Sequence, residues 1–227
     1  MVREPLQGPK GVATAEEVRI PPLGLGGFLG LPARAVGIVL FAHGSGSSRF
    51  SRRNNHVAAL LQKAGFATLL FDLLSGEEGE DRERVFDIQL LAERLQFATD
   101  WLAGEPELAD LQVGYFGAST GSAAALIAAA TGKQKVHAIV SRGGRPDLAD
   151  AYLLKVKAPT LLIVGGNDFG VIELNQTAFD LLTCEKALEI VPGATHLFEE
   201  PGALDRVADL AAQWFRRFLG GNIEVGR

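Results

Sequence analysis

Short stretches rich in apolar residues alternate with amphipathic stretches along most of this sequence. The clearest, residues 36–42, is a continuous apolar run of the kind found in strands buried on both faces of a sheet. Further strands are expected at residues 66–71, 111–116, 136–140, 160–164 and 187–191. Helical spacing occurs at residues 54–64, 82–102, 119–130, 171–182 and 203–219, and a short helix is expected after Pro146. This alternation predicts an α/β fold with a mainly parallel sheet and helices on both faces.

The N-terminal part follows a different pattern. Residues 15–20 and 25–31 have the pattern of two strands, and the glycines between them favour a hairpin. Residues 1–13 are punctuated by proline, glycine and lysine, so we expect a loose segment there. No linker or break in composition follows, and a length of 227 residues suits a single domain over residues 1–227.

Composition and charge narrow the class of protein. The chain is 47% hydrophobic and 22% charged, which indicates an ordered globular protein. Cys184 is the only cysteine, so neither a disulfide framework nor a cysteine-based zinc site is expected. The net charge of −5 argues against nucleic acid or an anionic membrane as the main partner.

Two segments bear on location and assembly. Residues 111–132 lack charge but are rich in small residues, and their pattern indicates a strand and a helix rather than a membrane span. The N-terminus has no apolar run behind its first charge, so we expect a reduced, cytoplasmic protein without a secretory signal. Trp214, Phe215 and Phe218 have helical spacing that favours core packing over a dimer interface, which leaves the oligomeric state open.

The motif Gly117-Ala118-Ser119-Thr120-Gly121 stands where a predicted strand passes into a helix. In α/β sheets, ligands bind outside the carboxyl ends of the strands. A serine in such a turn is held in a strained backbone conformation with its Oγ exposed, and the following helix directs its positive end at the site. We therefore interpret Ser119 as a nucleophile, with a helix-capping serine as the alternative. Ser122 lies inside the helix and is interpreted as a packing residue.

A serine hydroxyl needs a base that takes its proton. His196 lies in a loop between the last strand and the last helix, and it is our candidate base. His43 follows a strand and is expected to fix the loop after it. His56 and His137 fall within predicted elements and are expected to be structural.

Asp168 is our candidate for the acid that orients His196. It follows a predicted strand, so serine, aspartate and histidine come in the chain order of the α/β-hydrolase type. Asp72 also ends a strand but precedes the serine, and we expect it to brace a loop. Asp205 and Glu199 lie close to His196 in the sequence and rank below Asp168.

Acyl transfer also needs donors for the developing oxyanion. We expect these to be the backbone N–H groups of Thr120 and Ser45, with Gly44 as the alternative to Ser45. No metal or other cofactor is expected in this chemistry.

Arginines gather on two loops at the same rim of the predicted sheet. The first loop carries Arg49, Arg52 and Arg53, and the second carries Arg142 and Arg145. In an acidic protein this favours an anionic group on the substrate, and Arg49 and Arg142 are the candidate contacts. The alternative is that these arginines form salt bridges or are solvated.

With these motifs the chain resembles α/β-hydrolases of the dienelactone hydrolase-like group, from about residue 15 to residue 220. The resemblance is carried by His43-Gly-Ser-Gly-Ser-Ser48, Gly117-Ala-Ser-Thr-Gly121, Gly165-Gly-Asn-Asp168 and Ala194-Thr-His196. It implies eight strands, no cofactor and no large cap domain. Residues 141–147 resemble small hydrolase-like domains that are sometimes joined to phosphoribosyltransferase domains. Dienelactone hydrolases proper use a cysteine nucleophile, so a serine at position 119 favours an esterase or lactonase.

Our main hypothesis is a serine hydrolase that cleaves a small ester, lactone or thioester through an acyl-enzyme. Transfer of the acyl group to an alcohol or to peroxide is a variant on the same residues. The alternative from another class is a binding or regulatory domain that keeps the fold without turnover.

Overall fold

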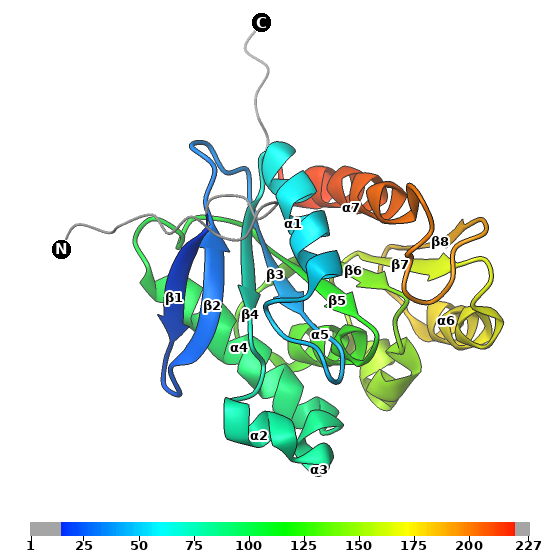
Figure 1. The fold of residues 1–227 in the computed structure, drawn as a ribbon, viewed down its shortest axis with the longest axis horizontal. Coiled ribbons are helices and arrows are strands. Elements are labelled where there is room, and N and C mark those ends of the chain that lie inside the picture. Colours follow the sequence, from blue (N-terminus) through cyan, green and yellow to red (C-terminus); the bar gives the residue numbers. More distant parts are fainter. Residues whose placement is uncertain (1–14, 221–227) are drawn as a thin grey trace, which may run out of the picture.

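One sheet of eight strands runs through the computed structural model, which describes residues 15–220 (Figure 1). Its spatial order is β1-β2-β4-β3-β5-β6-β7-β8. The hairpin partner β2 pairs antiparallel with β1 and β4, and all other pairs are parallel. The strands are β1 (Glu16–Ile20), β2 (Leu25–Gly30), β3 (Ile38–Ala42), β4 (Ala67–Phe71), β5 (Val113–Ala118), β6 (Val136–Arg142), β7 (Thr160–Gly165) and β8 (Lys186–Val191). The predicted hairpin and mainly parallel sheet are thus confirmed, while the loose segment expected at residues 1–13 lies outside the described residues.

Helices cover both faces of this sheet. α1 (Arg52–Lys63) and α7 (Ala203–Leu219) pack on one face. The other face is covered by α4 (Ile88–Gly104), α5 (Thr120–Thr131), the 3₁₀ segment η1 (Pro146–Lys155) and α6 (Phe169–Leu181). In the described part of the chain, η1 is the sole helical element between β6 and β7, so no large cap domain enters at this point.

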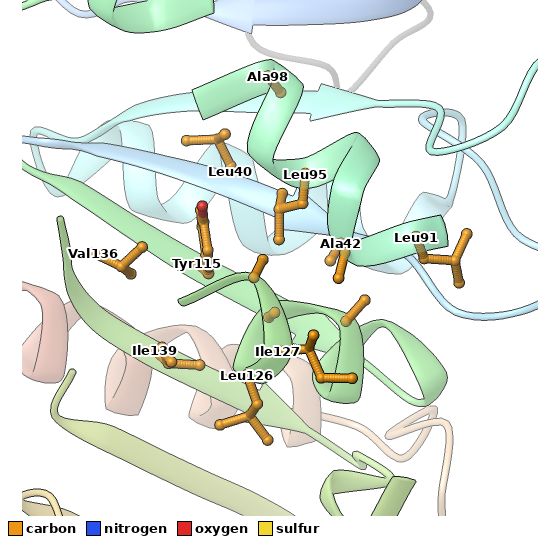
Figure 2. Packing of buried hydrophobic residues seen from close by; sticks show 14 of the residues in the cluster. Leu40, Ala42, Leu91, Leu95, Ala98, Tyr115, Leu126, Ile127, Val136 and Ile139 are labelled. Atoms are coloured by element: carbon orange, nitrogen blue, oxygen red, sulfur yellow. The ribbon is translucent and has the colours of Figure 1, made fainter. Parts of the chain in front are cut away.

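The alternation of side chains along β3 connects the sheet to both helical layers. Leu40 and Ala42 belong to the apolar cluster that includes α4 and α5, whereas Val39 and Phe41 belong to the cluster that includes α1 and α7. Figure 2 shows Leu40 and Ala42 near Leu95 of α4. Because both faces are buried, every residue of β3 is apolar, which explains the continuous run in the sequence.

The predicted helix over residues 82–102 was wrong as a single element. The structure divides it into α3 (Arg82–Val85) and α4, and it adds a short α2 (Gly76–Glu80) before them. At the break, Asp87 has a ψ of 89° and its carboxylate accepts a hydrogen bond from the N–H of Leu90 at 3.0 Å. An aspartate that caps a helix in this way competes with the helix that would run through it.

The uncharged residues 111–132 contain the whole of β5 and α5, as the pattern indicated. None of the helices within residues 15–220 combines the length and the apolar character needed to cross a bilayer. On α7, Trp214 and Phe215 are buried and Phe218 is partly buried against the same apolar cluster, which confirms the predicted core packing of this aromatic face.

The crossing of β3 and α5 depends on Gly121, and this generates a stability prediction. A Cβ at position 121 would lie 2.1 Å from the carbonyl oxygen of Ala42, so Gly121→Ala is expected to destabilise the fold by about 3 kcal/mol or more. Gly104, near the end of α4, has open space, and Gly104→Ala is expected to stay within about 1 kcal/mol of the parent. Urea unfolding of both variants checks this, and equal midpoints would contradict the expected clash.

Candidate active site

Ser119 occupies a strained turn between β5 and α5. Its φ of 51° and ψ of −123° lie in a region that costs a non-glycine residue about 1–3 kcal/mol. Backbone hydrogen bonds hold the turn on both sides. The N–H of Ser119 donates to the carbonyl of Arg142 at 3.3 Å, and the Ser119 carbonyl accepts from the N–H of Arg145 at 3.0 Å. This is the conformation that presents a serine Oγ at the end of a strand.

The two flanking glycines allow the turn to be this tight. A Cβ on Gly117 would lie 2.5 Å from the Cα of Ser122, and one on Gly121 would strike the backbone of Ala42. Gly44 also approaches the turn, because a Cβ there would lie 3.0 Å from that of Ser119. The spacing of glycines in the motif therefore has a direct steric cause.

His196 and Asp168 form a hydrogen-bonded pair. The distance from His196 Nδ1 to Asp168 Oδ2 is 2.7 Å. A carboxylate can only accept, so Nδ1 carries a proton, and in the neutral form of the ring Nε2 has the lone pair. The Asp168 side chain is 16% exposed and that of His196 is 39% exposed. Asp168 is therefore the more buried member of the pair and His196 the more exposed one.

Two loops bring this pair together from different strands. Asp168 follows β7, and His196 follows β8. Backbone hydrogen bonds join the loops, from Asn167 to the Ala194 carbonyl at 2.9 Å and from Gly166 to the Val191 carbonyl at 2.8 Å. Both aspartate and histidine are thereby fixed to neighbouring strands.

Ser119 and His196 line one cavity of about 180 Å³, together with Gly44, Ser45 and Arg142. Within residues 15–220, no hydrogen bond joins Ser119 Oγ to the His196 ring. The structure brings the three sequence candidates to one place, with His196 bonded to Asp168 and not to Ser119.

The expected oxyanion donors are arranged differently from the prediction. The N–H of Ser45 is not free, since it donates to Oγ1 of Thr120 at 2.9 Å. The threonine side chain, which sequence reasoning had not considered, thus occupies the donor assigned to the substrate. Gly44, the alternative, faces Ser119 across the same cavity.

His43 fixes the loop that carries Gly44 and Ser45. Its Nε2 accepts from the N–H of Leu73 at 3.1 Å, and its Nδ1 lies 3.0 Å from the carbonyl of Gly44. Because a carbonyl only accepts, the proton is on Nδ1 and the ring is neutral. The ring therefore ties the end of β3 to the end of β4, in agreement with the structural role expected for it.

The structure corrects the interpretation of Arg49 as a substrate contact. Its guanidinium pairs with Asp72 and lies 3.6 Å from Glu17, and it stacks on the rings of Phe28 and Phe50. Asp72 also accepts from the Arg49 backbone N–H at 2.7 Å, which is the bracing role expected of this aspartate. Arg49 is engaged in these contacts and does not line the cavity of Ser119.

The remaining arginines of the rim differ in whether they bind a carboxylate. Arg145 binds Asp147 through two hydrogen bonds of 2.9 and 2.8 Å. Arg142 is buried and lines the cavity. Arg53 also lines the cavity, and its guanidinium donates to Glu199 at 2.9 Å.

Sequence reasoning missed Asn54, which is buried and accepts from Arg142 at 3.3 Å. The signal was available, because Ser51 caps α1 and places its first turn at the rim.

The other acids that were weighed against Asp168 have partners elsewhere. Asp205 lies 2.6 Å from His56, and Glu199 pairs with Arg53. Among residues 15–220, no group of three or more histidine, cysteine, aspartate or glutamate side chains is placed to hold a metal ion. The pairing of Asp168 with His196 is therefore not duplicated by either alternative acid.

A second and larger cavity, of about 360 Å³, lies on the other side of the loop after β3. It shares Gly44, Ser45 and Ser47 with the first cavity. Its remaining wall includes apolar side chains and two carboxylates, from Leu74, Val85, Leu91, Asp72 and Glu80. The loop after β3 thus separates two cavities of different character.

Comparison with known sequences gives a family and longer relatives. A family model described as the dienelactone hydrolase family matches residues 25–219. A Mycobacterium tuberculosis protein that bears the name "Putative phosphoribosyl transferase" is 59% identical over 208 residues. The match covers 91% of this chain but 47% of that protein, so the chain spans about half the length of this relative.

Comparison with solved structures gives neighbours of similar fold. The crystal structure of dienelactone hydrolase from Anabaena variabilis has a TM-score of 0.86 and 58% identity, covering 90% of this chain and 97% of that chain. Est1E from Butyrivibrio proteoclasticus has a TM-score of 0.73 at 16% identity, with coverages of 89% and 98%. The second likeness concerns the fold alone.

The buried His43 ring predicts a loss of stability in mild acid. Burial lowers the pKa of His43 below its ordinary value, and the Gly44 carbonyl and Asp72 only partly oppose this. The unfolded chain therefore takes up the proton first, so the contribution is complete above about pH 6.5 and declines as pH falls towards the folded-state pKa. Urea unfolding at pH 7.5, 6.5 and 5.5 should show this slope, and His43→Gln should reduce it. Parallel pH profiles for the two proteins would contradict the assignment.

Proposed function

Because the chain belongs to the dienelactone hydrolase family and has the α/β-hydrolase fold, we propose that it is a serine hydrolase of a small carboxylic ester, lactone or thioester. The family supports hydrolase chemistry in general. The serine mechanism and the substrate classes are our proposal. The observation that carries it is the strained Ser119 in one cavity with His196, whose Nδ1 is held by Asp168.

In the proposed reaction, Nε2 of His196 takes the proton of Ser119 Oγ as this oxygen attacks the substrate carbonyl. Asp168 stabilises the imidazolium that forms. His196 then gives its proton to the leaving oxygen or sulfur, and an acyl-enzyme remains on Ser119. Water, deprotonated by the same histidine, releases the acyl group and restores the serine.

The developing oxyanion would lie at the N-terminus of α5. The Thr120 N–H is one donor, and the positive end of the helix favours negative charge at this point. The second donor comes from the loop after β3. It is either the N–H of Ser45, once it leaves the Thr120 hydroxyl, or that of Gly44.

The proposed partner is a small molecule, and the proposed location is the cytoplasm. Among structural neighbours, Est1E from Butyrivibrio proteoclasticus has been solved with ferulic acid bound, which is consistent with small carboxylic compounds in this fold. We propose that the mechanism uses the protein's own side chains, within a single domain over residues 1–227.

A second candidate is a domain that binds a ligand without turning it over. It is favoured by the relative of about twice the length that is named as a phosphoribosyl transferase, because a hydrolase-like unit there accompanies another sequence. Acyl transfer to an alcohol or peroxide uses the same residues as hydrolysis. The relative rates of transfer to water, peroxide and alcohol separate these outcomes.

An activated serine predicts a single covalent adduct. Incubation with a fluorophosphonate should add one phosphonyl group on Ser119, because His196 removes the serine proton. Intact mass and peptide mapping measure this. Ser119→Ala should give no adduct, while Ser122→Ala, three residues along in α5, should be labelled like the parent. An unlabelled but folded parent protein would favour the binding domain.

The Asp168–His196 pair predicts a large loss of kcat when the Asp168 carboxylate is replaced by an amide. Asp168→Asn would present an amide to Nδ1 and favour the wrong tautomer, so kcat on an activated ester should fall by roughly 10³- to 10⁴-fold. The matched control is Asp205→Asn, which alters the acid that pairs with His56 and should leave kcat near the parent value. Equal losses in both variants would exclude a special role for Asp168.

A further inference from the structure

A buried asparagine lies on the inner face of α6, the yellow helix of Figure 1. Of the side chains of this helix, those of Asn175 and Ala178 are buried, and Asn175 is 0% exposed. The Oδ1 atom of Asn175 is buried without a hydrogen-bond partner among residues 15–220. Asparagine is a poor helix former, and an unpaired amide oxygen in the core lowers stability. An apolar side chain would therefore favour folding more at this position, so stability alone does not account for the amide.

The other end of this amide binds the loop after β6. Nδ2 of Asn175 donates to the carbonyl of Gly144 at 2.9 Å, in a buried bond between residues 31 apart in the chain. It also donates to the carbonyl of Val171, one turn earlier in α6, at 2.8 Å. Within the described residues, the Gly144 carbonyl accepts no other hydrogen bond. Asn175 is therefore the group that pairs this carbonyl.

The carbonyl of Gly144 and the N–H of Arg145 belong to one peptide group. A peptide group is planar, so its carbonyl and its N–H cannot turn independently of each other. The N–H of Arg145 donates to the carbonyl of Ser119 at 3.0 Å. The same peptide group is thus held by Asn175 on one side and by the strained turn of Ser119 on the other.

The surroundings of Gly144 leave the loop little room to shift. A Cβ at this position would overlap with the hydroxyl oxygens of Ser141, on β6, and Ser122, on α5. The loop therefore lies tightly against both elements. The orientation of the peptide group between Gly144 and Arg145 then depends on its two hydrogen bonds, to Asn175 and to Ser119.

The helix that carries Asn175 also begins at the acid of the candidate active site. Asp168 is the N-cap residue of α6, and its carboxylate binds Nδ1 of His196. Asn175 follows seven residues later, about two helical turns along. Since no hydrogen bond joins Ser119 Oγ to the His196 ring within residues 15–220, their relative position depends on links of this kind. Asn175 connects the helix that starts at Asp168 to the backbone that holds Ser119.

We propose that Asn175 is a positioning residue, which sets the place of Ser119 relative to the Asp168–His196 pair through the peptide group between Gly144 and Arg145. This inference rests on the proposed serine hydrolase function and adds a residue to it. Asn175 does not line the cavity of Ser119, so it acts on the backbone and not on the substrate. Its loss should therefore slow the attack by Ser119 and leave ligand binding unchanged.

The test replaces the amide with an apolar side chain of similar size. Asn175→Leu removes the donor to Gly144 together with the unpaired Oδ1. Phosphonylation of Ser119 by a fluorophosphonate is followed over time by intact mass, at several reagent concentrations. The limiting rate constant should fall by about 10- to 100-fold, as expected for a displacement of the nucleophile by a fraction of an ångström to 1 Å. The half-saturating concentration should stay within about twofold of the parent value, and kcat on p-nitrophenyl acetate should fall as well.

The matched control is the next residue of the same helix. Gln176 is exposed, and its amide binds Asp180 at 3.1 Å. Gln176→Leu makes the same change from amide to leucine away from the loop, and it should be labelled at the parent rate.

The final extent of labelling separates positioning from a loss of fold. A residue that serves stability alone would leave part of the Asn175→Leu protein unfolded and unreactive, while the folded part reacts at the parent rate. Slow labelling that reaches one adduct on every molecule supports the inference. Incomplete labelling at the parent rate overturns it, and so does complete labelling at the parent rate.

A second variant covers the case in which Asn175→Leu shows no cooperative unfolding in urea. Asn175→Ala lacks the same donor and favours the helix, and the same outcomes apply to it. Loss of cooperative unfolding in both variants would assign Asn175 to stability and overturn the inference. A parent protein that neither reacts with the fluorophosphonate nor hydrolyses the ester would reject the proposed function, and this inference with it. A reactive parent with equally reactive Asn175 variants would overturn the inference alone.

Discussion

The strained backbone of Ser119 is the constraint on which the rest of the site depends. A φ of 51° is unfavourable for serine, so the surrounding structure has to hold it in place. Gly117 and Gly121 let α5 approach β3 and β5 closely, and the loop after β6 donates to and accepts from Ser119 itself. Ser119 is therefore positioned by the packing of the central strands rather than by a flexible loop.

The end of β6 contributes both to the turn at Ser119 and to the cavity wall. The carbonyl of Arg142 accepts the Ser119 N–H, while the Arg142 side chain lies in the cavity. The next residue, Gly143, has a φ of 51°, and a Cβ there would lie 3.0 Å from the His196 carbonyl. Two consecutive residues, Arg142 and Gly143, thus lie against both Ser119 and the backbone of His196.

The sequence predicted the candidate site residues that directly follow strands. The order of Ser119, Asp168 and His196 and the glycines around the serine predicted which residues meet, because parallel strands deliver their carboxyl ends to one rim. The sequence did not predict which side chains distant from one another along the chain form pairs. Nothing in the sequence distinguished Arg49, which pairs with Asp72 23 residues away, from Arg142, which among residues 15–220 contacts the amide of Asn54 and no carboxylate. The break at Asp87 was missed because the apolar spacing on either side continues through it, and only the capping side chain interrupts the helix.

The Thr120 hydroxyl occupies the backbone N–H of Ser45 by accepting a hydrogen bond from it. A neutral carbonyl oxygen that displaces this hydroxyl exchanges one neutral hydrogen bond for another and gains little. In the proposed reaction, an oxyanion would accept the same N–H more strongly, because hydrogen bonds to charged groups are roughly twice as strong as neutral ones. The threonine would thus withhold a donor from the bound substrate and release it as charge develops, so that this contact acts on the height of the barrier and not on affinity.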